Sequence, residues 1–247
     1  SNPAFPHHLP DPNNPKNLRS LIRRVKSSKA DLGLAFDGDG DRLGVVDPRG
    51  RIYGGELLMV ILSRDLLERK KKAKIVVEVK LSDALLDDIK NHGGTPIVSK
   101  TGHSFIEDEM KKHNSMLGGE FSGHLFIKED YFGYDDALFA AAKVLNIISN
   151  KNVGISELVK GLPEYYTSKE IRLRCPENKK FVIVEGLKKY FKGKNRISSI
   201  DGVKIHFKGG WALVRASNTQ PVLDMRFEAK SKKALARIKR EVYARIR

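Results

Sequence analysis

A run of seven residues at 74–80, Lys-Ile-Val-Val-Glu-Val-Lys, constrains the fold of this chain more than any other stretch. Its β-branched residues favour an extended strand, and the run is too apolar for the exposed edge of a sheet. Strands that are buried on both faces are typical of parallel sheets, whose strands are joined by helices. Leucine-rich helical patterns flank the run at 55–73 and 81–92, and another strand is expected at 95–100. This alternation predicts a mixed α/β domain.

The pattern changes after Gly154. Apolar residues at 203, 205 and 207, and again at 223, 225 and 227, alternate with polar residues. A period of two predicts antiparallel strands with one face packed on a core and the other in solvent. Helices are expected at about 178–191 and from about residue 231 onward. The sequence therefore predicts a separate α+β C-terminal domain with an antiparallel sheet, beginning after a boundary at 161–163.

Three aspartates alternate with glycines between two apolar runs, at Asp37, Asp39 and Asp41, and Arg42 follows them. Carboxylates this close repel one another unless a cation lies among them, and oxygen ligands suit Mg²⁺. An EF-hand calcium loop begins in the same way, but it needs glycine at position six and glutamate at position twelve. Here those positions hold Arg42 and Pro48. We therefore interpret the loop as a divalent metal site, with an acidic hairpin turn that binds no ligand as the alternative.

Composition limits the classes of partner. The 247 residues are 40% hydrophobic, enough for a core, and carry a formal net charge of +16. Such a charge suits nucleic acid or small anionic substrates such as phosphate esters. The basic clusters are interpreted as solvated surfaces, because no aromatic platform lies among them, and no nucleic-acid partner is expected. No run is long enough to span a membrane, no signal peptide is recognised, and the single Cys175 favours a cytoplasmic location.

A glycine-framed loop at 118–124 presents the side chains of Glu120, Ser122 and His124. A carboxylate, a hydroxyl and an imidazole with little bulk around them suit a ligand that is rich in hydroxyl groups. The alternative is a hairpin whose Glu120 and His124 only cap backbone groups.

A second polar loop, Arg-Ala-Ser-Asn-Thr-Gln-Pro at 215–221, is expected between two strands of the C-terminal domain. An arginine fork, two hydroxyls, an amide and backbone N–H groups can together form a phosphate cradle. An ordinary turn rich in serine and asparagine remains the alternative.

Two lysines, Lys80 and Lys100, each follow an expected strand, and His103 precedes an expected helix. Ligands of open α/β sheets bind outside the carboxyl ends of the strands. These three side chains are therefore expected at the ligand edge of the sheet.

Taken together, these motifs resemble the α-D-phosphohexomutase family, and within it the bacterial phosphomannomutase/phosphoglucomutases. The acidic loop is similar to the family's metal loop, residues 119–124 to its sugar-binding loop, and residues 215–221 to its phosphate-binding loop. The motifs stand in the family's order across essentially the whole chain. The resemblance implies reversible transfer of phosphate between C1 and C6 of glucose or mannose, through glucose 1,6-bisphosphate or mannose 1,6-bisphosphate. It also implies a cytoplasmic enzyme, monomeric when intact, that binds hexose 1-phosphates and 6-phosphates.

The resemblance implies a role for each site residue. Mg²⁺ would be held by Asp37, Asp39 and Asp41 against a phosphoserine. The catalytic residues would be Arg42 and Lys80, which neutralise the transferring group, and His103, which moves a proton of the sugar hydroxyl. Sugar O3 and O4 would be bound by Glu120 and Ser122, and the distal phosphate by the loop of the C-terminal domain. The full set of expected substrate-binding residues is Lys100, Glu120, Ser122, His124, Arg215, Ser217, Asn218 and Thr219.

Three departures from the family pattern matter. Phe121 stands where dual-specificity enzymes usually carry methionine, which leaves glucose versus mannose preference open. Ser-Asn-Thr at 217–219 favours a hexose mutase over phosphoglucosamine mutases, which usually carry Ser-Gly-Thr. The family's phosphoserine loop, of Thr-x-Ser-His-Asn-Pro type, has no counterpart in the sequence.

We therefore expect residues 1–51 to be the end of the family's second domain, 52–163 its third and 164–247 its fourth. A chain without the serine is expected to be inactive alone. The alternative is a non-catalytic module that binds phosphosugars or nucleic acid.

Overall fold

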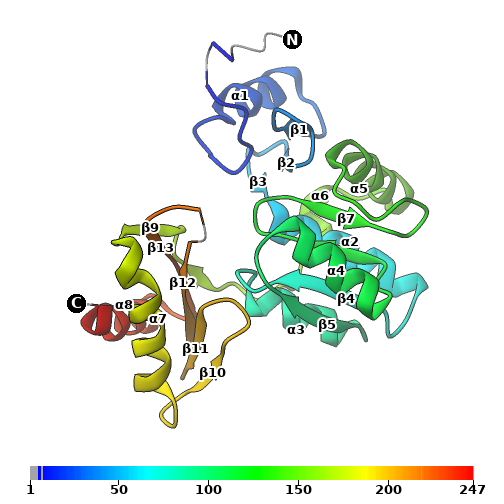
Figure 1. Ribbon diagram of the computed structural model, residues 1–247. Helices are drawn as coiled ribbons and strands as arrows, with labels where there is room; N and C mark the ends of the chain where they lie inside the picture. The colour runs from blue at the N-terminus through cyan, green and yellow to red at the C-terminus, as the bar shows by residue number, and fades with distance from the viewer. Residues whose placement is uncertain (1–4, 7, 218, 247) are drawn as a thin grey trace. The chain divides into compact units, whose positions relative to one another are not determined.

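The computed structural model describes residues 5–6, 8–217 and 219–246, and it divides the chain into two compact units (Figure 1). The first unit is Ser1–Leu162, coloured blue to green, and the second is Pro163–Arg247, which ends in red. None of the helices in the described ranges combines the length and apolar character needed to cross a lipid bilayer.

The centre of the first unit is a four-stranded sheet in the order β5-β4-β6-β7. The middle strand β4 (Lys74–Glu78) runs parallel to β5 (Thr95–Ser99) and to β6 (Leu117–Gly119). The edge strand β7 (Leu125–Ile127) is antiparallel to β6. The prediction of a buried parallel strand is confirmed, because the last four residues of β4 are all buried.

Helices cover both faces of this sheet. On one face, α4 (His103–His113) packs Ile106 and Met110 against Val76. On the other face, Ile75 and Val77 belong to a larger core that the remaining helices share with the sheet. These helices are α2 (Gly55–Arg69), α3 (Asp83–Asn91), α5 (Ala137–Lys151) and the short α6 (Ile155–Leu158).

Two side chains set where helices begin after the strands and so shape the sheet's loops. The Ser82 hydroxyl accepts a hydrogen bond from the Ala84 N–H (3.0 Å) at the start of α3. The Asp136 carboxylate accepts one from the Phe139 N–H (2.9 Å) at the start of α5. Such caps satisfy N–H groups that a helix leaves without intrahelical partners, and each typically contributes about 1 kcal/mol.

A small antiparallel sheet carries the acidic loop. It consists of β1 (Gly33–Phe36), β2 (Leu43–Val46) and β3 (Ile52–Tyr53), and α1 (Arg19–Ser28) packs on one of its faces. Leu43 and Val45, on the other face, belong to the main core of the unit. The loop between β1 and β2 is therefore attached to a buried hairpin.

The second unit is built on an antiparallel sheet in the order β10-β11-β12-β13-β8, and β9 pairs with the first half of β13. The predicted antiparallel sheet is confirmed. Both α7 and α8 contribute to the one core, which also contains Val203, Ile205 and Phe227. The element bounds are β8 (Tyr166–Thr167), β9 (Ile171–Arg174), α7 (Glu177–Phe191), β10 (Arg196–Ser198), β11 (Val203–Phe207), β12 (Gly210–Ala216), β13 (Val222–Ala229) and α8 (Lys232–Ile246).

The expectation that one face of this sheet lies in solvent is wrong for its central strands β11, β12 and β13. Polar side chains there, such as Lys204, Asp224 and Glu228, are buried and interact with one another across the strands, whereas Arg172 and Arg196 on the outer strands are exposed. The Trp211 indole N–H donates to Glu228 (2.8 Å), and the Lys204 ammonium lies 4.0 Å from the centre of the Trp211 ring. The Arg215 guanidinium donates to Asp224 (3.0 Å) in the neighbouring strand. Alternation alone could not reveal that these charges pair.

Candidate functional site

The acidic loop is wrapped around Asp37, whose side chain is almost fully buried. Its Oδ1 accepts hydrogen bonds from the backbone N–H groups of Gly40 (3.2 Å), Asp41 (3.1 Å) and Arg42 (3.0 Å). Its Oδ2 accepts one from the Arg42 Nε (2.5 Å). Burial opposes ionisation of Asp37, but these bonds, led by the Arg42 N–H, outweigh it and lower its pKa to about 2. The loop is therefore preorganised around a carboxylate that is ionised at neutral pH.

The other two carboxylates lie close to Asp37, in an arrangement that could hold a cation. Ligand oxygens of Asp37, Asp39 and Asp41 all lie within 4.8 Å of one another. The Oδ1 of Asp41 is buried and makes no hydrogen bond to any described residue. Burial raises the pKa of Asp41 to about 6, and the hydrogen bond and charge of Asp37 add to this. A buried oxygen without a hydrogen bond, near two other carboxylates and 3.8 Å from the Arg42 Nε, fits a hard divalent cation such as Mg²⁺.

Binding of Mg²⁺ to this loop is expected to weaken as the pH falls below about 6. Asp41 must lose its proton to bind the cation, while Asp37 stays ionised. The association constant should therefore be constant above pH 7 and fall up to about tenfold per unit between pH 6 and 4. Isothermal titration calorimetry in two buffers should show about one proton released at pH 5 and almost none at pH 7.5. Affinity that is unchanged between pH 7 and 5 would contradict this assignment, and Asp41→Asn should bind weakly without the pH slope.

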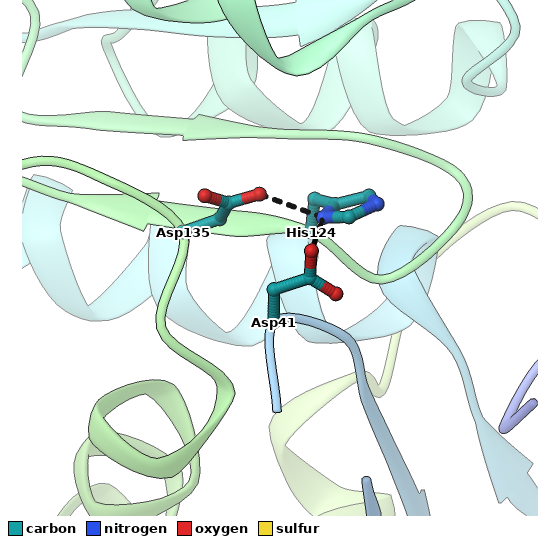
Figure 2. A group of neighbouring side chains, drawn as sticks. All are labelled: Asp41, His124 and Asp135. Atoms are coloured by element: carbon teal, nitrogen blue, oxygen red, sulfur yellow. Dashed lines mark hydrogen bonds and ion pairs between the residues drawn. The ribbon is translucent and has the colours of Figure 1, made fainter. Parts of the chain in front are cut away.

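His124 connects the acidic loop to the glycine-framed loop (Figure 2). Its Nδ1–H donates to the Asp135 carboxylate (2.7 Å) and lies 3.6 Å from the Asp41 carboxylate. Burial opposes protonation of the ring, but the bond to Asp135 and the surrounding carboxylates outweigh it and raise the His124 pKa. Figure 2 shows the other ring nitrogen, Nε2, on the side away from both carboxylates. Asp41, His124 and Asp135 also lie close enough together to share a metal ion.

The backbones of the two loops are also joined. The Leu43 N–H, directly after the acidic loop, donates to the Gly123 carbonyl (3.1 Å). The Ala137 N–H, at the start of α5, donates to the Gly40 carbonyl (3.0 Å) and joins the acidic loop to that helix. Gly123 has a φ of +97°, and a Cβ there would lie 2.8 Å from the Leu43 carbonyl oxygen. Only glycine permits both this conformation and this approach. The sequence therefore specifies how closely the acidic loop and the glycine-framed loop pack.

Glu120 and Ser122 lie together in the glycine-framed loop. Glu120 is buried; its Oε1 accepts from the Gly102 N–H (2.8 Å) and its Oε2 from the Ser122 hydroxyl (3.0 Å). Burial raises the pKa of Glu120, and the neighbouring charge of Glu78 raises it further. The hydrogen bond from Gly102 to Glu120 therefore joins the loop after β5 to the glycine-framed loop.

The residues expected at the strand ends are placed unequally. Lys80 is almost buried, and its ammonium lies 3.0 Å from the Glu78 carboxylate. Lys100 is exposed, and its ammonium lies 5.4 Å from the centre of the Phe105 ring. Among the described residues, no contact joins Lys100 to Glu78, Lys80 or Glu120. His103 is the exposed first residue of α4, not a residue that precedes the helix. The sequence analysis assigned no role to Glu78 or Asp135. Glu78 could have been noticed, because it is the one acidic residue in the apolar run at 74–80.

A buried lysine donates hydrogen bonds to the backbone of the polar loop in the second unit. Lys180 of α7 is 1% exposed, and its ammonium donates to the carbonyl oxygens of Ser217 (2.5 Å) and Gln220 (3.3 Å). Arg215 donates through Nε to Asp201 (3.0 Å) and through Nη1 to Asp224 (3.0 Å). The Thr219 N–H lies 3.4 Å from the Ser217 hydroxyl oxygen. Asn218, also predicted to bind substrate, lies outside the described residues.

These features define a class: an α/β protein with an acidic loop joined to a polar glycine-framed loop, followed by an α+β unit with its own polar loop. Models of three domains of one family match in series. They are phosphoglucomutase/phosphomannomutase α/β/α domain II at residues 1–50, α/β/α domain III at 54–166, and the C-terminal domain at 170–245.

Similar proteins agree with these matches. A phosphomannomutase/phosphoglucomutase from Pseudomonas syringae pv. tomato is 43% identical over 244 residues, which are 98% of this chain and 52% of the relative. A phosphoglucomutase from Neisseria meningitidis serogroup A is 44% identical over 244 residues, 98% of this chain and 53% of the relative. The crystal structure of a phosphoglucomutase/phosphomannomutase family protein from Burkholderia thailandensis superposes with a TM-score of 0.87 at 37% identity, covering 98% of this chain and 52% of that one.

The chain therefore belongs to the phosphoglucomutase/phosphomannomutase family, the α-D-phosphohexomutases, as the sequence motifs predicted. It spans about half the length of the curated relatives that it matches.

Proposed function

We propose that this chain is the part of a phosphohexomutase that holds the metal loop, the sugar-binding loop and one phosphate-binding loop. The reaction is reversible transfer of phosphate between C1 and C6 of glucose or mannose, through a hexose 1,6-bisphosphate. The observation that carries the proposal is the junction at Leu43 and Gly123, where the acidic loop is hydrogen-bonded to the loop that presents Glu120 and Ser122. A cation loop tied to a polar, glycine-framed loop suits an enzyme that must position a phosphate against a sugar hydroxyl.

The acidic loop supplies charge. Asp37, Asp39 and Asp41 would hold Mg²⁺, which would neutralise charge on the transferring phosphoryl group. Arg42 is oriented by Asp37 and would bind phosphate oxygens, as would Lys80. The exposed imidazole of His103 would exchange a proton with the sugar hydroxyl.

The sugar would be bound by the glycine-framed loop. Glu120 and Ser122 would contact O3 and O4, which glucose and mannose share, with His124 beside them. Relatives of nearly equal identity carry the names phosphomannomutase/phosphoglucomutase and phosphoglucomutase. We therefore propose that both sugars are accepted, and that Lys100 enters the substrate set only once substrate is bound.

The second unit would bind a phosphate group through Arg215, Ser217, Asn218 and Thr219. The Nε and Nη1 of Arg215 already donate hydrogen bonds to two carboxylates. We therefore propose that Nη2 is the nitrogen that binds phosphate. We also propose residues 1–51, 52–163 and 164–247 as successive domains of a monomeric, cytoplasmic enzyme; the free, buried Cys175 supports a reducing compartment.

The test is a titration of the 247-residue chain with glucose 6-phosphate and mannose 6-phosphate in Mg²⁺, followed through backbone amide resonances. Amides of residues 119–124 and 215–219 should shift with both ligands. Unphosphorylated glucose is the matched control and should bind more weakly, because it offers nothing to Arg215 or the acidic loop. No shift at millimolar sugar phosphate would contradict the proposal.

Turnover needs a second measurement. The family's phosphoserine motif has no counterpart in the printed sequence, so mutase activity is expected only in a protein that supplies one. A coupled assay for glucose 6-phosphate formed from glucose 1-phosphate, with glucose 1,6-bisphosphate added, should show no activity with the 247-residue chain. Activity that Asp39→Asn abolishes would show that another residue carries the phosphoryl group.

A further inference from the structure

Glu78 is a buried carboxylate at the carboxyl end of β4, and its side chain is fully shielded from solvent. Three donors converge on it. The Thr101 hydroxyl donates to Oε1 (2.7 Å), the Lys80 ammonium lies 3.0 Å from Oε1, and the Phe121 backbone N–H donates to Oε2 (2.8 Å). Burying a charge without partners is very costly, so these three contacts are what permit it here.

The three donors come from three different loops. Lys80 lies between β4 and α3, Thr101 between β5 and α4, and Phe121 between β6 and β7. Under the proposed function, each loop carries or directly adjoins a residue that contacts substrate: Lys80 itself, His103 at the start of α4, two residues after Thr101, and Glu120 directly before Phe121. One carboxylate therefore contacts all three loops at the carboxyl edge of the sheet.

We propose that Glu78 is a positioning residue, whose buried carboxylate fixes the Lys80, Thr101 and Phe121 loops in one arrangement before substrate binds. This inference rests on the proposed function only for the identity of the ligand. The positions of the three loops are a property of the protein without ligand. Contacts that hold binding groups in place before the ligand arrives reduce the ordering that binding would otherwise require.

A second contact extends the fixed arrangement. Glu120 accepts from the Gly102 N–H, so the loop that holds Thr101 is joined to the loop that holds Phe121 by a second bond. Glu78 and Glu120 are also close enough for the charge of Glu78 to act on Glu120. The two carboxylates therefore belong to one network of hydrogen bonds under the sugar-binding loop.

An amide cannot replace this carboxylate. Glutamine offers one acceptor oxygen and two N–H donors, whereas the three groups around Glu78 all donate. In Glu78→Gln at least one of the loops must lose its contact and face another donor. Glu78→Asp keeps the charge on a shorter side chain and should retain part of the network.

The experiment compares Glu78→Gln and Glu78→Asp with the wild-type 247-residue chain. Asp88→Asn is the matched control, because Asp88 is a buried carboxylate that receives two bonds from Arg64 (2.6 and 2.9 Å) outside this network. Two quantities are measured: hydrogen exchange and chemical shift of the Phe121 amide without ligand, and the dissociation constant for glucose 6-phosphate.

In Glu78→Gln we expect the Phe121 and Gly102 amides to shift and to exchange at least about tenfold faster. Sugar phosphate should bind roughly 10–100-fold more weakly, because binding would then have to order the loops. Glu78→Asp should lie between Glu78→Gln and wild type in both quantities. Asp88→Asn should lower the unfolding temperature but leave the Phe121 amide and the sugar-phosphate affinity unchanged.

The inference is overturned if Glu78→Gln folds with the Phe121 amide and the affinity both unchanged, or if Asp88→Asn changes them equally. It is also overturned if the Phe121 amide of the wild-type chain exchanges without protection. A wild-type chain with a protected Phe121 amide that binds no sugar phosphate would overturn the proposed function instead, and the two failures are thereby distinguished.

Discussion

Replacing Asp37 with asparagine is expected to weaken Mg²⁺ binding at least about 100-fold, or about 2.8 kcal/mol at 1.4 kcal/mol per tenfold. Asp37 is a proposed ligand and also the acceptor around which the loop folds, because three backbone N–H groups and the Arg42 side chain donate to it. Asparagine has only one acceptor oxygen, so it can accept from the donors on one side of Asp37. Its NH₂ group would then face the remaining donors. Calorimetric titration with Mg²⁺ at pH 7.5 measures the loss.

The matched control for that change is Asp39→Asn. Asp39 is exposed and makes no hydrogen bond to any residue that the structure describes, so its replacement removes a proposed ligand without removing the loop's central acceptor. Asp39→Asn should weaken Mg²⁺ binding while the amide shifts of residues 40–42 stay as in wild type. Asp37→Asn should change both. Equal effects of the two variants on the metal-free amide spectrum would contradict the central place of Asp37.

Replacing Arg215 with alanine is expected to destabilise the second unit by about 3 kcal/mol and to abolish phosphate binding there. The change removes the guanidinium that pairs with both the Asp201 and Asp224 carboxylates, which are largely buried, and leaves Asp224 only the more exposed Arg172. Breaking a buried pair by removing one partner typically costs about 3–5 kcal/mol. Trp211 is the single tryptophan and lies in β12, so its fluorescence in urea reports on this unit.

Arg172 supplies the control for Arg215, because it contacts the same carboxylate. Its Nε lies 3.3 Å from Asp224, but its side chain is 52% exposed, against 11% for Arg215. Exposed ion pairs contribute at most about 1 kcal/mol, so Arg172→Ala should shift the urea midpoint only slightly. It should also leave the response of the Ser217 and Thr219 amides to inorganic phosphate intact. A larger loss of stability in Arg172→Ala than in Arg215→Ala would reverse the assignment.

Local sequence signals were enough for much of the fold. The β-branched run that became β4 predicted a buried parallel strand, and the alternation around Val203 and Leu223 predicted antiparallel strands. Both rest on side-chain period and propensity, which a stretch of five to eight residues already expresses. The acidic loop was likewise recognisable, because its carboxylates are neighbours in sequence as well as in space.

What the sequence did not reveal depends on pairing between distant residues. The period of β13 was identified, yet its polar residues are buried because partners such as Trp211 and Arg215 lie on another strand. The same holds for Asp135 with His124 and for Glu78 with Phe121, which is 43 residues away. The short strands β8 and β9 were missed because two and four largely exposed residues carry little periodic signal.

Asp41 belongs to two groups of potential ligands at once, one with Asp37 and Asp39 and the other with His124 and Asp135. A carboxylate that is shared in this way makes the two groups thermodynamically dependent. If a ligand at the sugar-binding loop moves His124 and thereby changes the affinity of the acidic loop for its cation, the cation must change the affinity for that ligand by the same factor. Measuring either affinity alone therefore gives a value that holds only for a stated concentration of the other ligand.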